Sequence, residues 1–218
     1  MLTNQNKENL SYLRHDFSRD QVDELTPKTD PFEQFEQWLA EALDRKLNDP
    51  NAMVLSTASA EGRPSSRVVL LKGFDENGFI FYTNYDSRKA GEIAANPFVS
   101  LLFYWAETGK QVRIEGMIKK VPAEMSDEYF ASRPRASQIG AAASPQSRVI
   151  EDRKYLEEKF AEFEKLAADK SIERPENWGG YIVVPEVFEF WQGRESRLHD
   201  RLRYTRNDSR WMVERLAP

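Results

Sequence analysis

Apolar residues recur at helical spacing in the segment that begins at Asp30. Aspartate is a common helix cap, Pro31 suits the first helical position, and Glu33 can reach back to the cap. The pattern continues to Asn48-Asp49-Pro50, a sequence typical of a helix end. It predicts a helix with a buried stripe made of Phe32, Phe35, Leu39, Leu43 and Leu47.

Short apolar segments follow this helix and predict strands, because β-branched and aromatic residues alternate between turn residues. Asn77-Gly78 marks a tight hairpin, since both residue types tolerate positive φ. Helical patterns at 87–95, 122–132 and 148–168 interrupt the strands, and 135–147 resembles a loop. The predicted strands cover 53–58, 67–72, 79–83, 98–105, 111–121, 180–184 and 187–191, with a last hairpin around 207–209.

The order of these elements is helix, strands, helices, strands, which is not a regular βαβ alternation. Antiparallel strands at hairpin spacing favour a barrel with helices packed outside it. We therefore predict a mostly β, antiparallel fold with flanking α-helices, formed by one domain over residues 30–218. Residues 1–29 are polar without a sustained period, so composition alone predicts a disordered arm.

Composition narrows the function. The 218 residues carry a formal net charge of -5, which argues against non-specific nucleic-acid binding. The absence of cysteine excludes disulfides, thiolate nucleophiles and Cys-ligated metals, and two histidines make an imidazole zinc site a poor prediction. No apolar run approaches the roughly 20 residues of a membrane helix. We expect a cytoplasmic protein with no membrane or nucleic-acid partner and no metal.

Cations nevertheless gather in four segments of this acidic chain. Three of them are Arg67 to Lys72, Ser87-Arg88-Lys89 at a helix start, and Arg133 to Ser137. Each segment alone is also compatible with a purely structural role. In the same order, these roles are a core strand with solvated ends, a solvated first turn of a helix, and an exposed basic loop. Together they suit small ligands that bear phosphate, because guanidinium forks and helix N-termini match phosphate oxygens.

The fourth segment follows a strand that ends near Trp191. If it stays extended, Arg197, His199 and Arg201 share one face. Three such groups repel one another unless an anion or an electron-rich ring lies between them, and Trp191 could stack on a flat ring. The residues alone identify neither the ligand nor any redox chemistry. No G-x-G-x-x-G or P-loop motif is present.

These segments together resemble the pyridoxamine 5′-phosphate oxidase family. The resemblance is carried by Arg67-Val-Val-Leu-Leu-Lys72, Phe81-Tyr82-Thr83-Asn84 with Ser87-Arg88-Lys89-Ala90, Ser132-Arg133-Pro134-Arg135 with Ser137-Gln138-Ile139-Gly140, and Phe188-Glu189-Phe190-Trp191-Gln192 with Arg197-Leu198-His199-Asp200-Arg201. It runs from about Leu13 to the terminal Arg215-Leu216-Ala217-Pro218. It implies an FMN-binding split β-barrel that acts as a homodimer. FMN would lie between the subunits, so that each site draws on both chains.

The resemblance also implies roles for individual residues. Residues 67–72 would contact FMN, together with nine residues from other parts of the sequence. The FMN set is Arg67, Val68, Val69, Leu70, Leu71, Lys72, Tyr82, Thr83, Arg88, Lys89, Gln111, Gln146, Ser147, Trp191 and Arg201. Within it, Gln111, Trp191 and Arg201 would lie nearest the isoalloxazine ring. The substrate phosphate would be held by Lys72, Tyr129, Arg133 and Ser137.

Arg197 and His199 would bracket the substrate ring as the catalytic pair, with Leu198 between them. The family's Arg-x-x-Tyr element in the N-terminal arm corresponds here to Arg14-His15-Asp16-Phe17. The resemblance implies that Arg14 and Phe17 fold over the substrate as a lid. Phe17 lacks the hydroxyl, so one hydrogen bond of the family pattern is lost.

The implied reaction belongs to vitamin B6 salvage. Pyridoxine 5′-phosphate or pyridoxamine 5′-phosphate would give a hydride equivalent from its 4′ carbon to FMN, forming pyridoxal 5′-phosphate. Oxygen would reoxidise the flavin and yield hydrogen peroxide, and the amine substrate would also release ammonia. Two alternatives are a split-barrel flavin reductase and a non-catalytic pyridoxal phosphate carrier. The block of Tyr129, Arg133, Ser137, Arg197 and His199 argues against the reductase.

Overall fold

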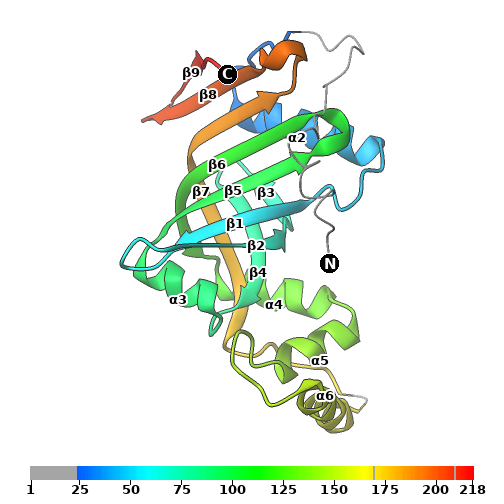
Figure 1. The fold of residues 1–218 in the computed structure, drawn as a ribbon. Coiled ribbons are helices and arrows are strands. Elements are labelled where there is room, and N and C mark those ends of the chain that lie inside the picture. The colour runs from blue at the N-terminus through cyan, green and yellow to red at the C-terminus, as the bar shows by residue number, and fades with distance from the viewer. Residues whose placement is uncertain (1–23, 169, 209) are drawn as a thin grey trace, which may run out of the picture.

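A curled antiparallel sheet forms the centre of the protein in the computed structural model, which describes residues 24–168, 170–208 and 210–218 (Figure 1). Its strands within that part of the chain are β1 (Ala52–Ala58), β2 (Pro64–Leu70), β3 (Gly73–Asp75), β4 (Gly78–Asn84), β5 (Phe98–Trp105), β6 (Lys110–Lys120), β7 (Trp178–Gln192), β8 (Asp200–Asn207) and β9 (Arg210–Arg215). The order is β2-β1-β5-β6-β7-β4-β3, with β8 paired to β7 and β9 paired to β8. The predicted mostly β, antiparallel fold is confirmed.

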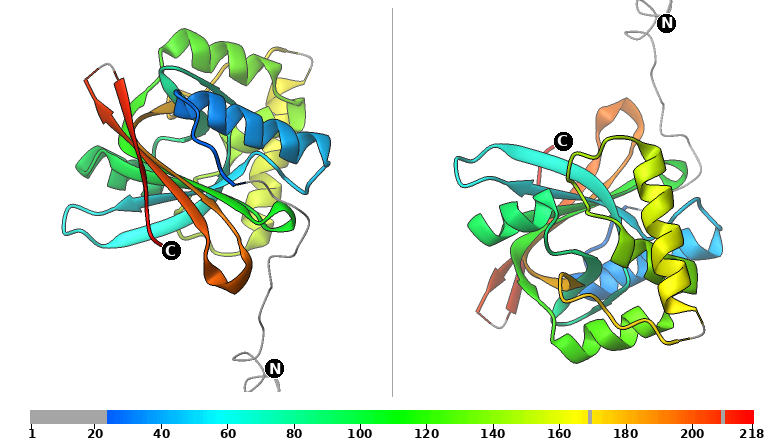
Figure 2. Two further views of the ribbon diagram at one scale, coloured as in Figure 1. Left: turned by 90° about the horizontal axis from the view of Figure 1, so that it is seen from above. Right: turned by 90° about the horizontal axis from the view of Figure 1, so that it is seen from below.

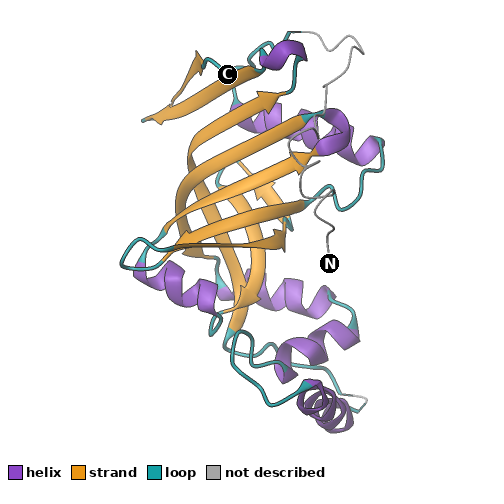
Figure 3. Cartoon of the chain, viewed as in Figure 1, coloured by secondary structure: helices purple, strands orange, loops and turns teal. Residues whose placement is uncertain are grey.

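Helices lie at both ends of the sheet. They are α2 (Pro31–Asp44), α3 (Arg88–Ala95), α4 (Ala123–Ser132), α5 (Arg135–Ala143) and α6 (Arg153–Ala167). Figure 3 shows α2 near one end of the sheet and α3 to α6 gathered near the other. Seen from below, α6 lies beside α5 (Figure 2). Within the described ranges, no helix is both long and apolar enough to cross a membrane.

Helix α2 supplies much of the core. Its start follows the prediction, because the Asp30 side chain accepts a hydrogen bond from the Phe32 N–H at 2.9 Å. The buried Phe35 ring packs edge-on against Phe79 and Phe103, with centroid distances of 4.9 Å in both cases. The predicted stripe is wrong at its end, where Leu43 is 54% exposed and the helix stops at Asp44.

Two predicted element boundaries are also wrong. Residues 135–143 form α5 rather than a loop, since Gln138 is buried and its Nε2 donates to the Phe130 carbonyl at 2.9 Å. Helix α6 begins only at Arg153, where Asp152 accepts from the Tyr155 N–H at 2.9 Å. Val149, predicted on its apolar stripe, is fully exposed.

Strand β7 runs without interruption through Pro185, where two strands were predicted. Its pairing with β6 shifts register between Glu115 and Gly116. Such an irregularity accommodates a residue that has no N–H to donate. A side chain at Gly116 would place its Cβ 2.0 Å from the Val184 carbonyl oxygen, so the close approach of the two strands requires glycine.

The base of the predicted N-terminal arm packs on the sheet. Leu25 is buried, and its carbonyl accepts from Arg215 Nη2 at 3.0 Å. The Tyr204 hydroxyl donates to the Lys28 carbonyl at 3.0 Å. Residues 24–29 are therefore attached to β8 and β9, contrary to the disorder predicted from composition. Arg14 and Phe17, the predicted lid residues, lie outside the described residues.

Candidate functional site

A cavity of about 530 Å³ lies where β2, β4, α3, α4, α5 and the start of β7 meet. We call it the basic cavity, after its cations Arg67, Lys72, Lys89 and Arg133. The structure brings predicted FMN and substrate residues together in its lining: Arg67, Val68, Val69, Leu70, Lys72, Tyr82, Thr83, Lys89, Tyr129, Arg133, Ser137 and Gln146. These residues come from distant parts of the sequence, so the fold, rather than local sequence, creates the concentration of positive charge.

Lys89 lies in the first turn of α3 and reaches across the basic cavity. Its Nζ donates to Thr83 Oγ1 at 3.0 Å and to Gln146 Oε1 at 2.8 Å. Burial and the nearby Arg67 charge lower the pKa of Lys89. No carboxylate forms an ion pair with Lys89 among the described residues. Its ammonium is hydrogen-bonded only to neutral oxygens, which leaves its charge available to an anion.

Buried Glu92, on the same helix, anchors two other cations. It accepts from Thr57 Oγ1 and Ser65 Oγ at 2.5 Å each, and from Arg88 Nε at 2.8 Å. Arg67 Nη2 lies 3.4 Å from the carboxylate. The Ser65 and Thr57 hydrogen bonds, followed by Arg88, hold the pKa of Glu92 at about 2 against the effect of burial. Glu92 is therefore ionised and fixes the Arg67 side chain at the cavity edge.

Arg133 caps the end of α4 and faces the aromatic wall of the basic cavity. Its guanidinium carbon lies 4.6 Å from the Trp178 ring centroid and 5.7 Å from that of Phe130. Burial lowers the pKa of Arg133, and Tyr129 opposes this shift. Its Nη1 is buried and has no hydrogen-bond partner. A buried donor without an acceptor is costly, and a phosphate oxygen in the cavity would satisfy it.

The residues predicted near the flavin ring form a row across three strands. Gln111 on β6 lies opposite Trp191 on β7, and Trp191 lies opposite Arg201 on β8. Directly opposed residues share one face of an antiparallel sheet. Arg201 Nε and Nη2 donate to buried Glu189 Oε1 at 3.0 and 2.9 Å. We call this arrangement the Trp191 row; its guanidinium is neutralised and its indole presents a flat surface.

The catalytic pair predicted at 197–199 lies beside this row. The His199 ring centroid is 4.6 Å from that of Trp191, and His199 Nδ1 accepts from the Arg194 N–H at 3.0 Å. Burial and the Arg197 charge lower the pKa of His199. The predicted shared face of residues 197, 199 and 201 is wrong, because Arg197 lies in a 3-10 turn with φ 60° and the chain is not extended there.

Within one protomer, the basic cavity and the Trp191 row lie near opposite ends of strand β7. Strand β7 begins with Trp178 at the cavity and carries Trp191 near its far end (Figure 1). About 40 Å of extended strand separates the two residues. None of the predicted residues Gln111, Trp191, Arg197, Leu198, His199 and Arg201 lines the cavity.

Three other predicted FMN residues also lie off the cavity lining. Leu71 belongs to the core and is 5% exposed. Arg88 is exposed and bonds Glu92, while Ser147 is exposed with φ 70° next to Gln146. The buried Leu71 side chain is not available to a ligand, whereas the exposed Ser147 follows directly on the cavity residue Gln146.

The sequence interpretation missed four residues that shape these sites. Trp178 and Pro134 line the basic cavity, Glu92 fixes the Arg67 guanidinium of that cavity, and Glu189 fixes the Arg201 guanidinium of the Trp191 row. Trp178 could have been found from its position before Gly179-Gly180, where a large ring precedes two residues without side chains. The two glutamates had no such signal, because only the fold surrounds them with donors.

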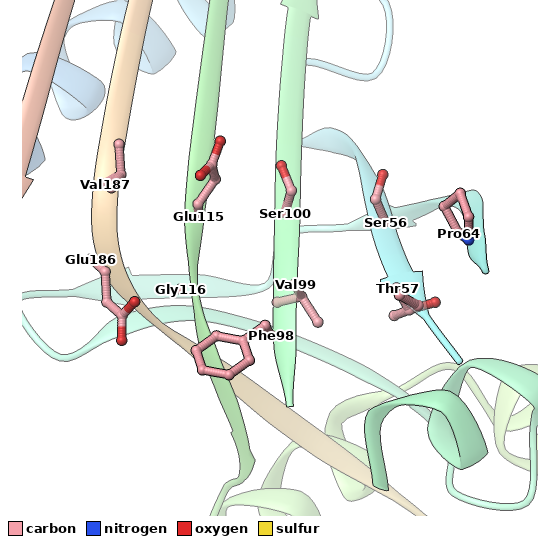
Figure 4. Close-up of a pocket in the computed structure, with 11 residues that line it drawn as sticks. Ser56, Thr57, Pro64, Phe98, Val99, Ser100, Glu115, Gly116, Glu186 and Val187 are labelled. Atoms are coloured by element: carbon pink, nitrogen blue, oxygen red, sulfur yellow. The ribbon is translucent and has the colours of Figure 1, made fainter. Parts of the chain in front are cut away.

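A second hollow, of about 350 Å³, lies on the sheet surface across β1, β5, β6 and β7 (Figure 4). Its lining includes the carboxylates of Glu115 and Glu186, and within the described residues it contains no Lys or Arg. Phosphate would be repelled there rather than held. The basic cavity is therefore the candidate site for a phosphorylated ligand.

Comparison with known proteins identifies the family of the chain. Residues 39–167 match the family model described as pyridoxamine 5′-phosphate oxidase. The chain belongs to this family. Residues 178–218 match the pyridoxine 5′-phosphate oxidase C-terminal dimerisation region, a segment that contains Trp191 and Arg201.

Relatives in this family cover nearly the whole chain. A pyridoxine/pyridoxamine 5′-phosphate oxidase of Paraburkholderia xenovorans is 55% identical over 96% of this chain and 99% of its own length. The enzyme of the same name from Rubrobacter xylanophilus is 53% identical, over 97% of this chain and 98% of its own.

Solved structures in the family share the fold. PhzG from Burkholderia lata, in complex with tetrahydrophenazine-1-carboxylic acid, has a TM-score of 0.85 and 35% identity over 90% of this chain and 99% of its own. A pyridoxamine 5′-phosphate oxidase-related, FMN binding protein from Nostoc punctiforme has a TM-score of 0.69 at 20% identity, over 88% of this chain and 100% of its own. The predicted split-barrel fold is confirmed.

Proposed function

We propose that this protein oxidises pyridoxine 5′-phosphate or pyridoxamine 5′-phosphate to pyridoxal 5′-phosphate, with FMN as cofactor and oxygen as final acceptor. The observation that carries the proposal is the basic cavity, where the buried Arg133 Nη1 lacks an acceptor beside Lys72, Tyr129 and Ser137. Relatives with this activity in their names, at 55% identity, support it.

The residues of this chain fit FMN. Lys89 donates hydrogen bonds to the neutral groups of Thr83, Ser87 and Gln146, so its ammonium charge suits the FMN phosphate. The Trp191 row offers an indole face and a fixed guanidinium, which suit the isoalloxazine ring. The chemistry that FMN supplies when bound is acceptance of the hydride equivalent and its transfer to oxygen.

The chain's own residues bind and orient the substrate. Lys72, Arg133 and Ser137 hold its phosphate, while Arg197 and His199 bracket its pyridine ring. Such positioning of two rings face to face removes much of the entropic barrier to hydride transfer. We assign Arg197 to orienting the ring rather than to proton abstraction, because a guanidinium offers hydrogen-bond donors and no acceptor.

We further propose a homodimer in which the basic cavity of one protomer faces the Trp191 row of its partner. This arrangement brings together the two halves that about 40 Å of β7 keeps apart in one chain. It is supported by the match of residues 178–218 to a dimerisation region. A two-fold axis would create two equivalent composite sites.

One assay tests the reaction. FMN-loaded protein is mixed in air with pyridoxine 5′-phosphate, and aldehyde and peroxide are followed together. We expect both products in equal amounts. Bound flavin without turnover contradicts the proposal and favours the flavin reductase, and tight binding of pyridoxal 5′-phosphate without flavin favours the carrier.

A parallel reaction with tetrahydrophenazine-1-carboxylic acid tests the chemistry suggested by the PhzG complex. The phosphate-binding character of the basic cavity predicts clear preference for the phosphorylated substrate. Equal or faster turnover of the phenazine would overturn the substrate assignment while leaving the oxidase class intact.

Mixed dimers test the composite site. Arg133→Ala and Arg197→Met change opposite halves, so each purified variant should have low activity. Refolding the two variants together should restore about a quarter of wild-type activity, because half of the dimers are mixed and each mixed dimer has one intact site. An unchanged low activity in proven mixed dimers contradicts the shared site.

A further inference from the structure

Three aromatic rings lie nearly parallel along one wall of the basic cavity. The Tyr82 and Tyr129 centroids are 4.0 Å apart with an interplanar angle of 17°. Trp178 follows at 5.5 Å from Tyr82 and 6.2 Å from Tyr129, with angles of 9° and 8°. The rings come from β4, α4 and β7, so the stack ties together three elements around the cavity.

A cation lies against the Trp178 ring of this wall. The Arg133 guanidinium carbon lies 4.6 Å from the Trp178 centroid, within the range of a cation–π contact. Arg133 makes no ion pair within the described part of the chain, and its buried Nη1 has no acceptor. The Trp178 ring is therefore a principal contact that fixes the direction of this side chain.

The backbone after Trp178 is adapted to the stack. A Cβ at Gly180 would lie 2.8 Å from Tyr82 Cε1, and one at Gly179 would lie 2.3 Å from the Tyr85 hydroxyl. Both contacts are closer than a side chain allows. Gly180 thus lets Tyr82 lie directly on β7, next to the Trp178 ring, and Gly179 lets Tyr85 approach the same strand.

We infer that Trp178 is a positioning residue for the phosphate-binding half of the basic cavity. Its ring holds the Arg133 guanidinium and the Tyr129 ring in the places from which they bind the substrate phosphate. The inference rests on the proposed function, and it assigns a role to a residue that the family resemblance left without one. Trp178 acts through Arg133, because its ring lies against the Arg133 guanidinium, which supplies the donors for phosphate.

Binding of pyridoxal 5′-phosphate to FMN-loaded protein, measured by isothermal titration calorimetry, tests the inference without turnover. Trp178→Leu should weaken binding roughly threefold to thirtyfold, the range that cation–π energies correspond to. KM for pyridoxine 5′-phosphate should rise in parallel, with kcat within about twofold and FMN retained. Trp178→Phe, which keeps an aromatic face, should recover most of the affinity.

A double-mutant cycle separates positioning from a direct contact. In an Arg133→Ala background, Trp178→Leu should cost less than about twofold, because the group it positions is already gone. Equal losses in both backgrounds overturn the inference. So does unchanged binding in the Trp178→Leu single variant.

Trp211→Leu is the matched control, since the Arg206 guanidinium carbon lies 5.9 Å from the Trp211 ring centroid but neither residue lines the cavity. It makes the same substitution at a cation–π contact elsewhere in the fold and should leave binding unchanged. If it weakens binding as much as Trp178→Leu, the effect is general loss of packing and the inference fails. Wild-type protein that neither binds nor forms pyridoxal 5′-phosphate overturns the proposed function itself, a result independent of the variants.

Discussion

In the basic cavity, Lys89 donates only to neutral oxygens and Arg133 keeps a buried nitrogen without an acceptor, whereas the Trp191 row balances Arg201 against the buried carboxylate of Glu189. Its neighbour Arg194 is likewise paired, with Asp200 at 2.6 Å. The two regions contain similar residue types. They differ in how far the protein itself neutralises them, because among the described residues Arg67 is the one cavity cation with a carboxylate partner, Glu92.

This difference indicates what each region can bind. Unneutralised cations in a partly buried cavity attract anions strongly, because little water screens them. A neutralised guanidinium beside an indole offers hydrogen bonds and a flat surface without strong net charge. Arg197 is the exception near the row, since it is exposed and has no carboxylate partner among the described residues. We therefore assign phosphates to the cavity and the planar rings to the row, with Arg197 reaching the substrate.

The largest expected effect concerns the anchor of the cavity cations. Glu92→Gln should lower the free energy of unfolding at neutral pH by up to about 3 kcal/mol, because the pKa of Glu92 falls from 4.5 to about 2 on folding. This stability is present above pH 4.5 and is lost as the pH falls toward 2. Denaturation curves across that range should have a flatter acid limb in the variant; an unchanged limb contradicts the anchoring role.

Arg197→Met should lower turnover on the order of 100-fold, because misplacement of the substrate ring by about 1 Å has effects of that size. FMN should remain bound, since Arg197 is assigned to the substrate. Absorbance of the purified flavoprotein and steady-state rates measure the two properties. Arg206→Met, at an exposed arginine on β8, is the control and should stay within about twofold. Loss of flavin together with activity would assign Arg197 to the cofactor instead.

The cations of α3 should separate FMN binding from substrate binding. Lys89→Met should weaken FMN affinity roughly tenfold, the value of one charged hydrogen bond. Arg88→Ala should weaken it less, about threefold, because Arg88 is exposed and already paired with Glu92. Fluorescence quenching of added FMN measures both, and substrate KM at saturating FMN should change little. An unaltered flavin affinity in both variants would contradict the assignment of the FMN phosphate to this part of the cavity.

The smallest expected effect is a shift in the titration of His199. Burial and then the Arg197 charge lower the pKa of His199 below 6.5, so the ring is neutral at pH 7 and its charged form appears only under more acidic conditions. Arg197→Met removes one of these causes and should raise the pKa. Ring-proton NMR follows the change, and His15, the other histidine of the chain, serves as reference. A constant or lower pKa of His199 would show that the Arg197 charge does not act on this ring.

Much of this organisation could be predicted from residue types and periodicity. The cap at Asp30, the Asn77-Gly78 hairpin and the clustering of cations depend on local chemistry, which the sequence displays directly. Helix α5 could not be predicted in the same way. It is stabilised by contacts such as that of Gln138 with the Phe130 carbonyl, which local propensity does not report.

For the candidate site, too, some features could be predicted from the sequence and others could not. The sequence determined that this acidic chain concentrates cations in four segments, and its motifs determined the family. Only the tertiary structure decided which cations are neutralised by Glu92 and Glu189. It also decided that the backbone at Arg197 is not extended and that the Trp178 ring faces Arg133. Charge balance and ring stacking depend on distances between segments far apart in the chain, and those distances exist only once the sheet has curled.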